Sequence, residues 1–133
     1  MTHSRRSQRT IAAWLATTVV LGLVATGCGG SSAPSGGAPH DTTVNLAMKD
    51  NFFDPKEITV PAGAKVTFSM KNEGVALHNI HIFSDDATPK NPITQPIGGG
   101  ATSQLVVTFP KKGTVKFQCD LHTPDMAGTI TVK

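Results

Sequence analysis

The chain has 133 residues with 12 Lys and Arg against 9 Asp and Glu, and all of its positive excess lies in residues 1–27. The remaining part holds nine lysines and nine acidic residues, so it is formally neutral and its charge gives no indication of nucleic-acid binding. About 106 residues remain, enough for one core but not for two domains, and their many Val, Ile and Thr argue against an all-helical bundle.

Residues 1–27 have the pattern of a signal peptide. Arg5, Arg6 and Arg9 precede residues 11–25, an uncharged stretch that is 15 residues long. A membrane-spanning helix needs about 20 apolar residues, whereas a shorter stretch after a positive start is typical of an export signal. We therefore expect residues 1–27 to direct export. The arginine pair leaves open whether the general secretory or the twin-arginine route is used.

Residues 28–40 are expected to form a lipidated tether. The residues before Cys28 are small and resemble a lipoprotein signal, in which this cysteine becomes the first mature residue and carries lipid on its sulfur. Two alternatives stay open, which are ordinary secretory cleavage nearby and a disulfide between Cys28 and Cys119. Residues 29–39 are Gly, Ser, Ala and Pro, which favour a flexible linker. The expected folded domain is 41–133.

From residue 41 onward the hydrophobic pattern has a period of two, which is typical of half-buried β-strands. The clearest case is 65–72, where Val66, Phe68 and Met70 alternate with polar residues. Residues 84–101 are rich in Pro and Gly and indicate a long connection or a weak edge strand. Short strands at this spacing predict an all-β, Greek-key sandwich or barrel of about seven to eight strands. The strands are expected at 43–48, 58–60, 65–72, 78–83, 103–109, 114–119 and 128–132.

Strand parity predicts that Cys119 and His78 face the interior. Cys119 follows Phe117 in the inward-facing row of its strand. His78 lies on the same face of its strand as Ile80 and Ile82. A thiol and an imidazole are therefore expected at the ends of two core-facing strands.

Two further histidines are expected to remain outside any metal site. His81 lies on the opposite face from His78, together with Asn79 and Phe83. His40 lies in the expected tether, where water surrounds it. Spacing alone would pair His78 with His81 on one ion, but strand parity separates them.

Residues 119–126 carry three metal-binding side chains in one short loop. Cys119 offers a thiolate, His122 an imidazole and Met126 a thioether. With His78 they make a His₂Cys set and a weak axial Met, which describes a blue-copper electron-transfer site. Zinc is the rival metal, but structural zinc sites favour four Cys or His ligands and rarely include Met. Each side chain also has an ordinary alternative, as a buried thiol, a surface or core histidine, or a gap-filling methionine.

These residues resemble the small blue-copper proteins of the plastocyanin-like cupredoxin family over roughly 42–133. The likeness lies in residues 51–63, in His78-Asn79, and in the segment from Phe117 to Gly128 that contains the ligand loop. It implies one mononuclear type 1 copper held by His78, Cys119, His122 and Met126, with Asn79 supporting the loop. Three residues separate His122 from Met126, where plastocyanins usually have four and amicyanins two.

The resemblance implies a monomeric electron carrier that cycles between Cu(I) and Cu(II). Its redox partners would be membrane-bound respiratory or photosynthetic components, reached from a lipid anchor on the extracytoplasmic, periplasmic side of the cell membrane. The sequence shows no Ser/His/Asp arrangement, so an enzyme is not expected. Two alternatives are a copper-handling lipoprotein, which would be expected to carry further Met or His pairs, and a metal-free β-sandwich that acts as a binding module.

Overall fold

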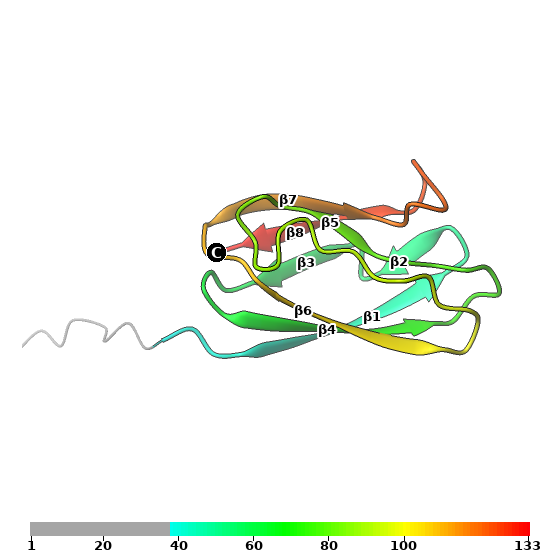
Figure 1. Ribbon diagram of the computed structural model, residues 1–133, viewed down its shortest axis with the longest axis horizontal. Coiled ribbons are helices and arrows are strands. Elements are labelled where there is room, and N and C mark those ends of the chain that lie inside the picture. The colour runs from blue at the N-terminus through cyan, green and yellow to red at the C-terminus, as the bar shows by residue number, and fades with distance from the viewer. Residues whose placement is uncertain (1–37) are drawn as a thin grey trace, which may run out of the picture. The chain divides into compact units, whose positions relative to one another are not determined.

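The computed structural model describes residues 38–133 (Figure 1). The expected signal peptide (1–27), the lipid-attachment residue Cys28 and most of the expected tether (28–40) lie outside the described residues. Those three assignments and the boundary of the folded domain therefore stay predictions. His40, near the start of the described part, is exposed. Residues 38–133 include no helix of the length and apolarity that crossing a membrane requires.

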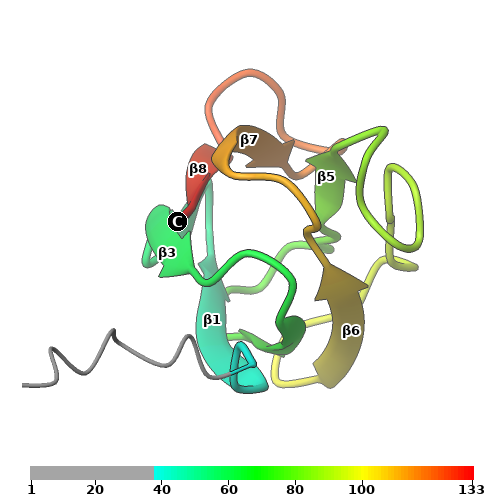
Figure 2. The ribbon, with the colours of Figure 1, turned by 90° about the vertical axis from the view of Figure 1, so that its left-hand side faces the viewer.

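Two sheets of four strands each make up the described part of the chain. Their orders are β2-β1-β4-β6 and β3-β8-β7-β5. Figure 1 shows the sheets as two facing layers, and Figure 2 shows the same strands after a quarter turn. The all-β prediction is confirmed. The strands are β1 (Thr42–Lys49), β2 (Phe52–Asp54), β3 (Glu57–Val60), β4 (Lys65–Asn72), β5 (His81–Phe83), β6 (Thr102–Thr108), β7 (Gly113–Gln118) and β8 (Ala127–Val132).

The core lies between the sheets and is built from alternate residues of each strand. In β4, Val66, Phe68 and Met70 are buried, whereas Lys65 and Lys71 are exposed. Burying each large apolar side chain contributes about 1.5–3 kcal/mol, which is why the hydrophobic face of the strand turns inward. The predicted bounds of β4 are confirmed.

Between β1 and β4 the chain changes sheets twice, in turns that contain Pro55 and Pro61. β1 and β2 pair antiparallel in the first sheet, β3 lies in the second, and β4 returns to pair in parallel with β1. Gly63, in the turn before β4, has a φ of 77°, which glycine adopts without strain, and its N–H donates to the carbonyl of Phe109. As β1 and β4 run in the same direction, the chain enters β1 at the end of the sandwich opposite the segment that follows β4 (Figure 1).

The strand expected at 78–83 is shorter in the structure. Only His81–Phe83 joins the sheet, because the backbone of His78 pairs instead with Ile97 through two hydrogen bonds of 3.1 and 2.8 Å. Residues 84–101 form a connection with isolated bridges along this edge, and no regular strand. The prediction that Asn79 faces outward is wrong. It is buried, since the chain leaves regular strand geometry there.

Candidate metal centre

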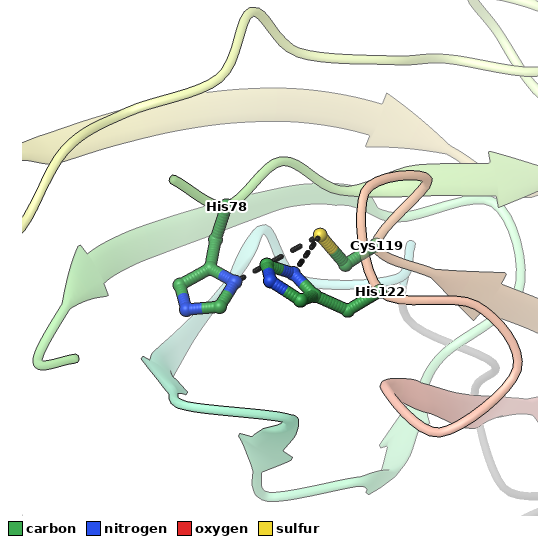
Figure 3. A group of neighbouring side chains, drawn as sticks. All are labelled: His78, Cys119 and His122. Carbon is green, nitrogen blue, oxygen red and sulfur yellow. Dashed lines mark hydrogen bonds between the residues drawn. The ribbon is translucent and has the colours of Figure 1, made fainter. Parts of the chain in front are cut away.

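Three candidate ligands from two distant segments meet at one end of the sandwich. His78 precedes β5, Cys119 follows β7, and His122 lies in the loop before β8. The Nδ1 atoms of His78 and His122 lie 3.8 and 3.5 Å from the sulfur of Cys119. Figure 3 shows the three side chains converging. Their potential ligand atoms all lie within 4.8 Å of one another.

The loop between β7 and β8 is held by its own backbone. The N–H of Cys119 donates to the carbonyl of Met126 at 2.9 Å, which continues the strand ladder by one rung. Within the loop that this bond closes, the N–H of His122 donates to the carbonyl of Cys119 at 3.2 Å. The N–H of Met126 donates to the carbonyl of His122 at 3.0 Å. The three residues are thus fixed relative to one another through the main chain.

Gly128, just after the loop, allows close packing beneath the strand that leads into Cys119. A Cβ at Gly128 would collide with the ring of Phe117 and with the carbonyl of Lys56. The Phe117 ring is itself buried against Phe53, with ring centroids 5.0 Å apart. The strand that leads into Cys119 therefore rests on close packing that any larger residue at 128 would disturb.

The candidate ligands differ in their exposure to water. The side chains of His78, Cys119 and Met126 are fully buried, and His122 is partly exposed. Among the described residues Cys119 is a free thiol. Met126 and Cys119 belong to one hydrophobic cluster, so the thioether lies on the core side of the loop. His122 is consequently the member of the set that lies nearest to solvent.

The surroundings of His78 favour its neutral form by lowering its pKa. Burial lowers the pKa of His78, and the nearby His122 lowers it further, while Asp50 acts in the opposite direction. The neutral imidazole is the form that binds metals, since a protonated nitrogen has no lone pair to offer. Nothing in the sequence pointed to Asp50, which reads as an ordinary turn residue.

Asn79 connects the two segments that carry the candidate ligands. Its side-chain oxygen accepts a 2.9 Å hydrogen bond from the N–H of Asp120. The carboxylate of Asp120 in turn accepts from Gln118, and this bond lowers the pKa of Asp120. His81 lies 3.1 Å from the other oxygen of this carboxylate. The His81 ring is therefore engaged at the surface and is not among the three converging side chains.

Sequence reasoning missed Asn72, which holds the segment leading to His78. Its side-chain nitrogen donates to the carbonyls of Ala76 and Ile97 at 2.7 and 2.8 Å, and its oxygen accepts from the N–H of Gly74. A signal was present, because parity places Asn72 in the inward-facing row of β4. A buried polar residue in such a row must find partners, and here it finds three.

A family model described as a cupredoxin-like domain matches residues 12–132. The chain belongs to the cupredoxin-like family. Plastocyanin A/B of Petroselinum crispum is 38% identical over 86 residues, which cover 60% of this chain and 86% of that protein. Dithionite-reduced auracyanin of the photosynthetic bacterium Roseiflexus castenholzii is 27% identical with a TM-score of 0.60, covering 71% of this chain and 98% of that one.

A second solved structure supports the same fold. Auracyanin A, a "blue" copper protein of Chloroflexus aurantiacus, is 22% identical with a TM-score of 0.59, and the match covers 68% of this chain and 98% of that one. The two-sheet architecture of this cupredoxin is therefore the one expected for its family.

The donor atoms of this cupredoxin fit copper. Two protein ligands about 2.0–2.3 Å from a shared ion lie roughly 3.5 Å apart, and the Cys119 sulfur is 3.5 and 3.8 Å from the two imidazole nitrogens. Thiolate and thioether sulfur with imidazole nitrogen is a soft donor set, which suits copper better than Mg²⁺ or Ca²⁺. The thioether of Met126 argues against structural zinc.

Proposed function

We propose that this cupredoxin binds one type 1 copper ion through His78, Cys119, His122 and Met126, and that it is an electron carrier, not an enzyme. The observation that carries the proposal is the convergence of His78, Cys119 and His122 at metal-ligand separations, in a loop closed by Met126. When bound, copper would supply a one-electron Cu(I)/Cu(II) couple. All four residues come from one chain, which is consistent with a monomer.

The protein's part in electron transfer is to hold its ligands still. The backbone bonds of the ligand loop and the bond from Asp120 to Asn79 hold the main chain that carries the ligands. A cage that keeps its shape in both oxidation states keeps the reorganisation cost of electron transfer low. The burial of Cys119 excludes water, and the partial exposure of His122 gives a partner its shortest approach.

Copper retention distinguishes an electron carrier from a copper-handling protein. We expect the copper-loaded protein to give a reversible one-electron wave by voltammetry and to keep its copper through repeated reduction in the presence of a Cu(I) chelator. His81→Ala serves as the control, because His81 is near the ligands but outside the converging group. Loss of copper to the chelator at each reduction would favour a chaperone or store.

We further propose that the chain is exported and lipid-anchored at Cys28 on the extracytoplasmic face of the cell membrane. The proposal is supported by the signal-like residues 1–27 and by the Gly/Ser/Pro-rich residues 29–39. Eleven flexible residues span about 20 Å, which gives the domain freedom to turn toward a membrane-bound respiratory or photosynthetic partner.

The anchor can be tested by cell fractionation. We expect the native protein in the membrane fraction and Cys28→Ser in the soluble extracytoplasmic fraction, because the variant has no sulfur to carry lipid. Cys119→Ser controls for loss of a thiol and should stay with the membrane. If Cys28→Ser also stays with the membrane, the anchor is not at Cys28.

A further inference from the structure

The carboxylate of Asp50 lies beside the buried far end of the His78 ring. Asp50 occupies the turn between β1 and β2, and its Oδ1 is 3.7 Å from Nε2 of His78. This nitrogen is buried and has no hydrogen-bond partner among the described residues. Figure 3 shows that it lies on the side of the ring away from Cys119. A buried polar atom without a hydrogen-bond partner costs folding free energy. At this distance the carboxylate is about half an ångström too far away to accept a hydrogen bond from Nε2.

The carboxylate is held in place by the segment that carries His78. Its Oδ1 accepts hydrogen bonds from the N–H groups of Val75 and Ala76 at 3.0 and 3.3 Å. Gly74 packs so closely that a Cβ there would collide with the carboxylate. Asp50 therefore fastens the β1–β2 turn to the approach to His78.

The position of the His78 proton decides whether the ring can bind a metal. A neutral imidazole has one N–H and one lone pair, and the two nitrogens exchange these roles between tautomers. Nδ1 faces the Cys119 sulfur at 3.8 Å, so a metal there requires the lone pair on Nδ1 and the proton on Nε2. An anion beside Nε2 attracts an N–H and repels a lone pair, which favours this tautomer.

We propose that Asp50 is a positioning residue that keeps the His78 proton on Nε2 and thereby leaves Nδ1 free for the metal. The inference rests on the proposed function, because it assumes that Nδ1 is a ligand. Asp50 also brings a negative charge near the metal centre. That charge favours Cu(II) over Cu(I) and holds the reduction potential down, to an extent limited by the half-exposed carboxylate.

The tautomer is tested first, in the metal-free protein, by ¹⁵N NMR of the His78 ring at about pH 8, above the ordinary imidazole pKa of about 6.5. We expect the native ring to carry its proton on Nε2, and Asp50→Ala to shift a substantial fraction to Nδ1. Gly74→Ala displaces the Asp50 carboxylate but keeps its charge, so it should also shift the proton toward Nδ1. This variant replaces Asp50→Ala in the test if Asp50→Ala does not fold. An unchanged Nε2–H tautomer in the folded variant would overturn the proposal.

The second measurement uses the copper-loaded protein. Asp50→Ala should bind copper about tenfold or more weakly, as is typical when the partner of a ligating histidine is removed. Asp50→Asn keeps an oxygen acceptor but loses the charge, so its reduction potential should rise. Asp54→Asn removes the same charge from the neighbouring β2 strand and should leave tautomer and affinity unchanged.

The two measurements separate the two proposals. A native protein that bound no copper would reject the proposed function. The tautomer measurement in the metal-free protein would still show whether Asp50 keeps the His78 proton on Nε2. Normal copper binding by Asp50→Ala together with an unchanged tautomer would reject the role of Asp50 alone.

Discussion

Replacing Cys119 with serine removes the intense visible absorption of the copper-loaded protein. That absorption arises from charge transfer between the thiolate and copper, and a serine hydroxyl cannot supply it. Cys119 is a free thiol among the described residues, and it lies within 4 Å of both imidazole nitrogens. The measurement is the visible spectrum after addition of Cu(II), for the native protein and the variant side by side. We expect complete loss of the band.

Matched variants show whether the loss is specific. Serine is close to cysteine in size, so far-ultraviolet circular dichroism should show an unchanged β-sheet spectrum. Cys28→Ser should keep the band, because Cys28 belongs to the expected anchor. Met126→Leu should also keep it, with an altered reduction potential, since the axial contact is weak. A folded native protein that stays colourless under oxidising conditions contradicts the copper proposal.

Copper raises the melting temperature of the protein by on the order of 20 °C. A ligand that binds only the folded state at 1,000 times its dissociation constant adds about 4 kcal/mol, and for a domain of about 100 residues each kcal/mol raises the midpoint by about 4–8 °C. His78 and Cys119 are 41 positions apart, so the unfolded chain does not hold them together. Calorimetry of the metal-free and copper-loaded protein measures the difference.

The control for this prediction is a variant that cannot complete the site. His78→Ala should melt at nearly the same temperature with and without copper, whatever its own stability. A chelator added to the native protein should return the midpoint to the metal-free value. Equal melting of native protein with and without copper would mean that the three side chains do not hold the ion.

The sequence was sufficient to predict the parts of the fold that depend on local pattern. The alternation over residues 65–72 gave β4 with its observed bounds, and parity correctly placed His78 and Cys119 in the interior. The results for β4 and Cys119 follow from the two-residue period of a strand, which needs no knowledge of neighbours. His78 lies before the regular strand, where the same rule failed for its neighbour Asn79.

The parts that could not be predicted depend on contacts between distant segments. β5 is short because the backbone of His78 pairs with Ile97 and not with β7. No local sequence pattern predicts this pairing. Asp50 meets Val75 across 25 positions, in a turn whose sequence is unremarkable. Asn72 is the intermediate case, since its polarity in a buried row was visible in the sequence while its partners were not.

For a domain anchored by lipid, the direction of β1 determines how high the candidate metal centre stands above the membrane. The chain enters β1 at the end of the sandwich opposite the segment that leads to His78. The eight residues of β1 correspond to a rise of about 26 Å at about 3.3 Å per residue. If the domain is anchored through Cys28 and stands upright, its redox end points away from the bilayer. A membrane-bound partner then meets it only by extending a domain to that height, or when the protein tips over on its tether.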